Sequence, residues 1–374
     1  MTDLVIDATE LARRVIPPTA FVADTQAFVD VRLPQSTGKA SYSFIGAGVS
    51  QNADTVVNLV EPHGFCVGAA AMPHGVVNNP HLHYTAEVFL CTRGRWRFDI
   101  GSGGEQSLEL GPGDVFSIPT WVFRGFENIG EDDGWLFSVL GGDDTGGILW
   151  APEVLRQAAE TGLYLAADHS VLDAADGPVG EDALAPLDDA ELVVDTYTDA
   201  ELEAHVSRPP DLAWSDRALL ASVLADHRVR LAPVIGFGLT EDRRHRPPIS
   251  HPHGFSLEWL EVEPGSSTGR HRFEGNAAAF LTEGYWHLRL NGSDDAIATD
   301  PPEGSVVSLP GGAWRELVNT GDQPARALMV TPGDARVHVE WAPEILTAAA
   351  DAGWARDASG YVAPLRLLGI GADR

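Results

Sequence analysis

The sequence has little basic charge and no long apolar runs. Of its 374 residues, 25 are Lys or Arg and 54 are Asp or Glu, which gives a formal net charge of −29. Lys39 is the only lysine. Proteins that bind nucleic acid or anionic membranes need clustered positive charge, so neither partner is expected. No apolar stretch reaches the ~20 residues that cross a bilayer, so no membrane-spanning segment is expected either.

The sequence is also poor in cysteine. Cys66 and Cys91 both lie in apolar, strand-like segments and imply no disulfide framework. The first fifteen residues carry acidic side chains where a secretory signal has basic ones. Hydrophobic residues make up 44% of the chain and charged residues 21%, as in a packed globular protein. We therefore expect a cytoplasmic globular protein.

An internal repeat organises the chain. The matching segments lie 190 positions apart in the first part of each copy and 191 positions apart in the second part. Gly75 and Gly94 match Gly265 and Gly284 at the first offset, and Arg124 matches Arg315 at the second. Longer matches are FIGAG at 44–48 with VIGFG at 234–238, PHGF at 62–65 with PHGF at 252–255, and WAPE at 150–153 with WAPE at 341–344. The register holds over roughly 120 residues per copy, so each copy is one structural unit.

Each copy has the pattern of a β-domain followed by one helix. Short apolar or alternating runs are separated by Gly and Pro, which is typical of strands and turns. The segments 150–162 and 341–353 have helical apolar spacing and end at a Gly. The expected boundaries are an N-terminal extension or arm at 1–40, a first barrel at 41–163, an acidic linker with short helices at 164–230, and a second barrel with a C-terminal helix at 231–374.

One segment of the first copy concentrates metal-binding residue types. On a strand, alternate side chains share a face, so His81, His83, Thr85, Glu87 and Cys91 are expected to point the same way. Two imidazoles and one carboxylate on one inward face match the 2-His-1-carboxylate arrangement of non-haem iron oxygenases. We therefore predict that His81, His83 and Glu87 hold one divalent metal per chain.

The spacing of this segment resembles a known family. Gly75, five residues, His-x-His, three residues, Glu87, six residues and Gly94 match the first motif of the cupins, and residues 113–119 with Asn128 are similar to the second motif. The resemblance covers both copies, so the chain is similar to a bicupin. It implies a mainly all-β fold of two tandem jelly-roll barrels with short flanking helices, and a metal inside the barrel. Cupins commonly form dimers, so a homodimer is expected.

Two departures from the family pattern bear on the metal. The second motif usually supplies a third His, and here that position is Arg124. The second copy keeps His271 but has Phe273 for His83, Ala277 for Glu87 and Arg315 for Arg124. One His does not hold a metal firmly, so the second barrel is expected to be metal-free.

Arg124 has two interpretations. It either pairs with Glu87 across the barrel, which would compete with a metal, or clamps an anionic substrate group beside the metal. The second copy keeps the Arg without the Glu, which favours an independent role. Residues expected to shape the pocket or contact substrate are Arg124, Trp121, Thr85, Cys91 and Phe126.

Three functions fit these residues. The first is a bicupin dioxygenase, most consistent with Fe(II), that acts on a small aromatic or keto compound with an optional carboxylate. The second is a metal-dependent isomerase, lyase or decarboxylase of the same fold. The third is a non-catalytic small-molecule-binding bicupin in which Glu87 is paired with Arg124. Mn, Ni, Co, Cu and Zn remain alternative metals, and no catalytic residue is assigned from the sequence.

Overall fold

The structure, a computed structural model, describes residues 4–188, 191–192 and 194–369. These residues form two compact units: 21–210 is one, and 4–20 together with 211–369 is the other. The expected arm at 1–40 is therefore divided between the units, and the expected linker at 164–230 is divided at residue 210. The reason is local pairing, because β1 (Val15–Ile16) joins a strand of the second barrel and Asp24 bridges to Ser41 in the first.

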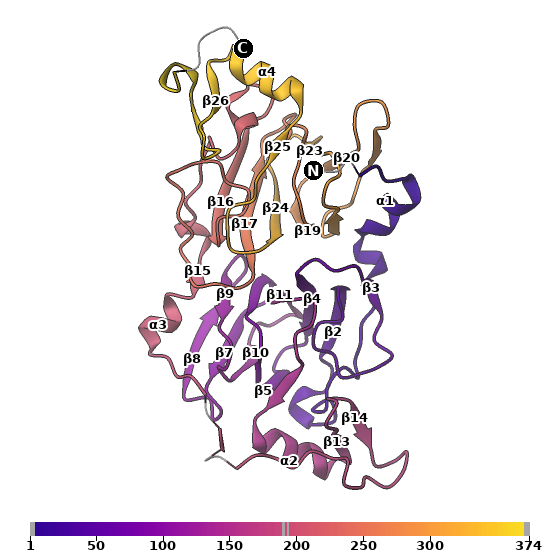
Figure 1. The fold of residues 1–374 in the computed structure, drawn as a ribbon. Helices are drawn as coiled ribbons and strands as arrows, with labels where there is room; N and C mark the ends of the chain where they lie inside the picture. Colours follow the sequence, from indigo (N-terminus) through magenta and orange to yellow (C-terminus); the bar gives the residue numbers. More distant parts are fainter. Residues whose placement is uncertain (1–3, 189–190, 193, 370–374) are drawn as a thin grey trace. The chain divides into compact units, whose positions relative to one another are not determined.

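The first unit is built from two β-sheets (Figure 1). The seven-stranded sheet has the order β15 (Val206–Ser207), β9 (Val115–Ile118), β6 (Glu87–Arg93), β11 (Gly134–Gly141), β4 (Phe65–Met72), β2 (Ala40–Ile45) and β3 (Val57–Leu59). The five-stranded sheet has the order β12 (Ile148–Trp150), β5 (Val77–His83), β10 (Arg124–Asn128), β7 (Trp96–Ile100) and β8 (Gln106–Leu110). A small hairpin, β13 (Leu163–Leu165) with β14 (Val171–Asp173), follows them.

The second unit repeats this plan. Its six-stranded sheet has the order β1, β22 (Val306–Leu309), β19 (Ala277–Glu283), β24 (Ala325–Pro332), β17 (Phe255–Val262) and β16 (Val229–Ile235). Its five-stranded sheet has the order β21 (Ile297–Thr299), β20 (Trp286–Leu290), β23 (Arg315–Asn319), β18 (His271–Arg272) and β25 (Glu340–Trp341). The pair β26 (Trp354–Arg356) and β27 (Val362–Pro364) comes last.

The four α-helices of the described residues are short and have clear start signals. The matching helices α2 (Pro152–Glu160) and α4 (Pro343–Asp351) each begin with a Pro at the first helical position, where its missing N–H costs nothing. In α3 (Asp199–Glu203), Thr198 and Glu201 form a capping box. In α1 (Ala8–Arg14), Asp7 caps the N-terminus by accepting from the backbone N–H of Glu10.

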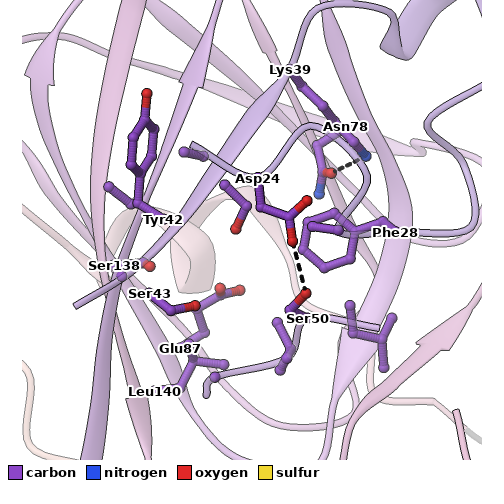
Figure 2. A pocket seen from close by; sticks show the side chains of 18 of the residues that line it. Asp24, Phe28, Lys39, Tyr42, Ser43, Ser50, Asn78, Glu87, Ser138 and Leu140 are labelled. Atoms are coloured by element: carbon purple, nitrogen blue, oxygen red, sulfur yellow. Dashed lines mark hydrogen bonds between the residues drawn. The ribbon is translucent and has the colours of Figure 1, made fainter. Parts of the chain in front are cut away.

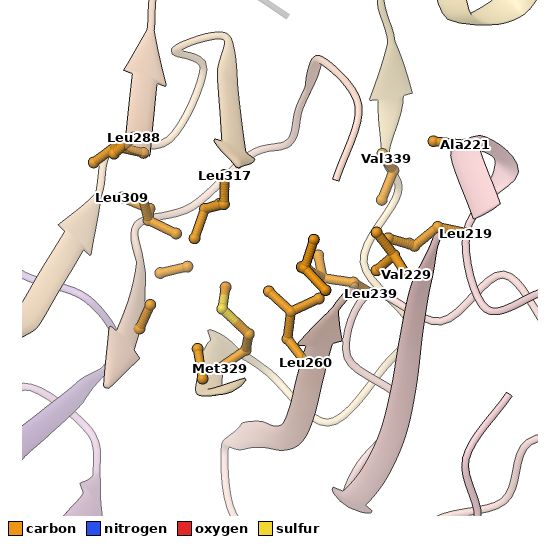
Figure 3. Close-up of a cluster of buried hydrophobic side chains, with 14 of the residues drawn as sticks. Leu219, Ala221, Val229, Leu239, Leu260, Leu288, Leu309, Leu317, Met329 and Val339 are labelled. Carbon is orange, nitrogen blue, oxygen red and sulfur yellow. The ribbon is translucent and has the colours of Figure 1, made fainter. Parts of the chain in front are cut away.

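Apolar side chains from both sheets of each unit meet between them. In the first unit this cluster is aromatic, and Phe98 packs against Phe89 and Phe126 at centroid distances of 5.3 and 5.5 Å. In the second unit it is mainly aliphatic, and Figure 3 shows Leu260, Leu309 and Met329 directed toward one another. The expected mainly-β fold with two tandem jelly-roll barrels and short helices is confirmed. In the described part of the chain, no helix is long and apolar enough to cross a membrane.

Candidate metal centre

The three predicted metal ligands lie together, but on two strands rather than one. His81 and His83 belong to β5 of the five-stranded sheet, and Glu87 begins β6 of the seven-stranded sheet. The expectation of one continuous strand is wrong, because the chain leaves the first sheet at Tyr84 and crosses to the other before Glu87. One ligand atom from each of the three side chains lies within 4.8 Å of the others.

Hydrogen bonds fix the orientation of both imidazoles. The Nδ1–H of His81 donates to the carbonyl oxygen of Asn79 at 2.7 Å, and the Nδ1–H of His83 donates to that of Gly147 at 3.3 Å. In this tautomer the lone pair is on Nε2. A metal-binding His in proteins almost always uses its other nitrogen in this way. The arrangement therefore presents two oriented donor nitrogens.

Arg124 pairs with Glu87 inside the barrel. Its Nε and one terminal nitrogen donate to the same oxygen, Oε2, at 3.2 and 2.9 Å, and its other terminal nitrogen donates to the Val122 carbonyl at 3.1 Å. The structure thus shows the first interpretation of Arg124, with one qualification. Because both bonds end on Oε2, the guanidinium leaves Oε1 of Glu87 for another partner.

Burial and charge set the protonation of the triad. Burial, with the neighbouring cations second, lowers the pKa of His81 well below its ordinary value and also lowers that of His83. Burial alone would raise the pKa of Glu87, but His83 and Arg124 outweigh it and lower that pKa to about 2. Two neutral imidazoles and one carboxylate at pH 7 are the protonation states that a divalent metal requires.

The triad lines a cavity of about 70 Å³ in the first barrel. In Figure 2, Glu87 and Asp24 direct carboxyl groups into this space from different elements, with Ser43 and Ser50 beside them. Asp24 accepts from Asn52, at 3.1 and 3.2 Å, and from Ser50 at 3.5 Å. Much of the remaining wall is apolar and comes from these residues: Phe28, Val31, Val49, Met72, Phe89, Phe126, Leu140, Ile148 and Trp150.

Comparisons with known proteins place this geometry in a wider context. Residues 69–140 match the Cupin domain family. Among solved structures, the oxalate decarboxylase of Lactobacillus farciminis in a formate complex has a TM-score of 0.56 and 14% identity, over 92% of both chains. A mutant of the Bacillus subtilis oxalate decarboxylase has a TM-score of 0.54 and 16% identity, over 90% of this chain and 83% of that one.

The chain has the bicupin fold. A third structure, of the same Bacillus subtilis enzyme and with Mn(II) centres in its title, has a TM-score of 0.51 and 15% identity, over 88% of this chain and 79% of that one. The comparison with curated proteins finds no match. At these identities the likeness to solved structures concerns the fold and does not extend to the chemistry of the site.

Only one of the five expected pocket residues lines the cavity of the first unit, among the residues described. It is Phe126. Arg124 is fully buried behind Glu87, and Cys91 is buried deeper in the aromatic cluster, where burial raises the pKa of its thiol. Thr85 lies in the crossing between the sheets, so its side chain does not follow the strand alternation. Trp121 is 44% exposed and packs edge-on against Tyr84.

Part of the cavity wall comes from residues 24–42, which neither sequence motif includes. Asp24, Phe28, Lys39 and Tyr42 all line the cavity, although they precede both motifs. Lys39 is 6% exposed, and its Nζ pairs with the fully buried carboxylate of Asp30. The available signal was the presence of a single lysine in a chain of 374 residues.

The second barrel has no comparable cluster in the described residues. Its His271 donates from Nδ1–H to the Gly269 carbonyl at 2.8 Å, as His81 does, but Phe273 stands in place of the second imidazole. The guanidinium of Arg315 lies 4.0 Å from the centre of the Phe273 ring and donates to backbone carbonyls instead of a carboxylate. Burial lowers the pKa of Arg315 to about 9.

Larger side chains also fill the second barrel where the first has its cavity. In the first barrel Gly68 lies opposite Ser138, and at the matching position of the second barrel Glu258 lies opposite Met329. Two small residues are thus replaced by two large ones. The carboxyl of Glu258 accepts from the backbone N–H of Leu239 at 2.7 Å through Oε1, while Oε2 is buried without a partner. Burial raises the pKa of Glu258 to about 8.

Proposed function

We propose that this bicupin is a metal-dependent enzyme with one divalent metal held by His81, His83 and Glu87 in its first barrel. The observation that carries the proposal is the convergence of two Nδ1-anchored imidazoles and a carboxylate on a buried cavity. The residues fit a metal, because both His are held neutral and Glu87 keeps Oε1 outside its pair with Arg124. A bound metal would polarise a substrate oxygen as a Lewis acid.

Three protein ligands favour oxygenase chemistry with Fe(II). A 2-His-1-carboxylate set leaves coordination positions for both a substrate and dioxygen. In this arrangement Arg124 positions the Glu87 carboxylate by holding Oε2, and the apolar wall limits the entry of water. Decarboxylation with Mn(II) is the second candidate, supported by fold similarity to oxalate decarboxylases, one of which has Mn(II) centres in its title.

The size of the cavity bears on the substrate. An engineered apolar cavity of ~150 Å³ accepts benzene, and this cavity has about 70 Å³. A small keto or carboxylate compound therefore fits the first barrel better than the aromatic alternative expected from the sequence.

The proposal is tested first by elemental analysis of protein purified without chelator. About one Fe or Mn per chain is expected, and its loss in a His83→Ala variant would place it at the triad. Absence of any first-row metal, including after incubation with Fe(II) or Mn(II) under argon, would refute a metal-dependent function. Oxygen uptake and CO₂ release with small keto and carboxylic acids then separate an oxygenase from a decarboxylase.

A further inference from the structure

Lys39 has a hydrogen-bonding capacity that its protein partners do not use up. Its Nζ pairs with Asp30 and donates to Oδ1 of Asn78 at 2.8 Å, the bond drawn in Figure 2. An ammonium group has three donors. Among the described residues the third has no acceptor, and Lys39 lines the cavity. A buried ammonium with a spare donor at a cavity wall is suited to bind an anion.

The ammonium lies close to the metal ligands. The ring of Trp150 is 5.6 Å from Nζ of Lys39, and its centroid is 5.3 Å from that of the His81 ring. The amide nitrogen of Asn78, whose oxygen accepts from Lys39, is 3.3 Å from Nδ1 of His81. Lys39 and His81 thus contact the same two side chains, and both line the cavity that the other two metal ligands also line.

The charges around the cavity also favour an anion. Lys39 and Arg124 are cations, while Asp24, Asp30 and Glu87 are carboxylates, so this set carries one excess negative charge. A divalent metal at the triad changes this to one excess positive charge. Because an uncompensated charge is costly in a buried site, a monoanion brings the metal-bound cavity to neutrality.

We propose that Lys39 binds the carboxylate of a short 2-oxo or 2-hydroxy acid, and that the neighbouring oxygen of this acid would be a ligand of a metal held by His81, His83 and Glu87. The inference rests on the proposed function, because the second contact is to the metal. It assigns substrate recognition to the N-terminal segment of the first unit, outside both cupin motifs. The cavity volume of about 70 Å³ restricts the acid to a few non-hydrogen atoms.

The test uses glycolate and its neutral analogue glycolamide, with the full-length protein. Removing Lys39 alone would strand Asp30, so the variant is Asp30→Asn/Lys39→Met, which removes both charges. Arg272→Met/Glu340→Gln removes an ion pair of the second barrel and serves as the matched control. Calorimetry with Mn(II)-loaded wild type and control is expected to show binding of glycolate in preference to glycolamide.

The Asp30→Asn/Lys39→Met variant is expected to bind glycolate at least ~10-fold more weakly, the loss of one charge-assisted hydrogen bond. Its Mn(II) content and circular dichroism should match those of wild type. Unchanged glycolate affinity in a folded, metal-loaded variant would overturn the proposal. Failure of wild type to bind glycolate, or equal binding of glycolamide, would also overturn it.

A second measurement separates this inference from the proposed function. Lys39 is the only lysine, so reductive methylation followed by peptide mass spectrometry reports on this side chain alone. In protein incubated with Mn(II), glycolate is expected to slow methylation of Lys39 several-fold, whereas glycolamide should not. Protection of Lys39 without any metal uptake would refute the metal-dependent function but support the anion site. Metal uptake without protection of Lys39 would refute the anion site but support the metal-dependent function.

Discussion

The ion pair between Arg124 and Glu87 leads to a quantitative prediction, because the second barrel contains the same arginine without the carboxylate. The Arg124→Met variant leaves a buried carboxylate without its cation. Removing one partner of a buried pair costs ~3–5 kcal/mol. At roughly 2–4 °C per kcal/mol for a unit of this size, the metal-free variant should unfold roughly 6–20 °C below wild type.

A divalent metal should recover part of this loss. The metal supplies the positive charge that Glu87 has lost, and a ligand at 100 times its Kd stabilises a folded protein by ~2.7 kcal/mol. The increase in Tm on adding Mn(II) should therefore be larger for Arg124→Met than for wild type. Differential scanning calorimetry with chelator and with Mn(II) measures both quantities.

Two further variants test whether the lost stability comes from the unpaired carboxylate of Glu87. Glu87→Gln/Arg124→Met removes both charges, so it should lose less stability than Arg124→Met and gain none from Mn(II). Within the described residues, the buried guanidinium of Arg315 donates only to the carbonyls of Pro310 and Ala313, so Arg315→Met should lose less stability than Arg124→Met. Equal losses for Arg124→Met and Arg315→Met, or no Mn(II) effect on Arg124→Met, would contradict the reasoning.

Three other outcomes follow from the structure. The His81→Ala variant should retain less than about a tenth of the wild-type metal in elemental analysis. Trp121→Ala, a change outside the cavity, should retain the wild-type metal content. Equal metal content in the two variants would show that His81 is not a ligand. Glu258 has a folded pKa of about 8, above its usual 4.5, so its contribution to stability falls as pH rises from 4.5 to 8, by up to ~5 kcal/mol. Glu258→Gln should therefore flatten the pH profile of Tm for the second barrel. An unchanged profile would show that Glu258 is not the source of the pH dependence. At Gly94, φ is +91° and a Cβ would lie 2.8 Å from the Cα of Gly134. Gly94→Ala should therefore lower the Tm of the first unit by several degrees. An unchanged Tm would show that the backbone there adjusts to the methyl group without strain.

The fold and the identity of the triad could be predicted because both depend on short-range pattern. The 190- and 191-residue offsets appear as matching elements, such as β4 with β17 and α2 with α4. Spacing alone selected His81, His83 and Glu87. It did not predict that the ligands would come from two sheets, because a three-residue crossing and a three-residue strand segment have similar composition.

The cavity wall could not be predicted from the motifs. Lys39 and Asp24 reach the cavity through contacts that span tens of residues, such as Asp24 to Asn52 and Lys39 to Asn78. The expected strand alternation does not continue through Thr85. It therefore did not predict which side chains face the cavity. Choosing between the two roles of Arg124 required knowing that its guanidinium contacts Glu87, and only the contacted oxygen, Oε2, shows that Oε1 is left for another partner.

The division of the chain into units has a consequence for dissecting the protein. The second unit is discontinuous, since residues before Phe21 belong with those after Pro210. Arg14 of the N-terminal segment donates to Ser308, and β1 extends the edge of the six-stranded sheet. A fragment beginning at residue 211 would thus lack β1, the edge strand of its six-stranded sheet. The second barrel is better isolated as a circular permutant, with its own N-terminal twenty residues rejoined by a linker, than by truncation.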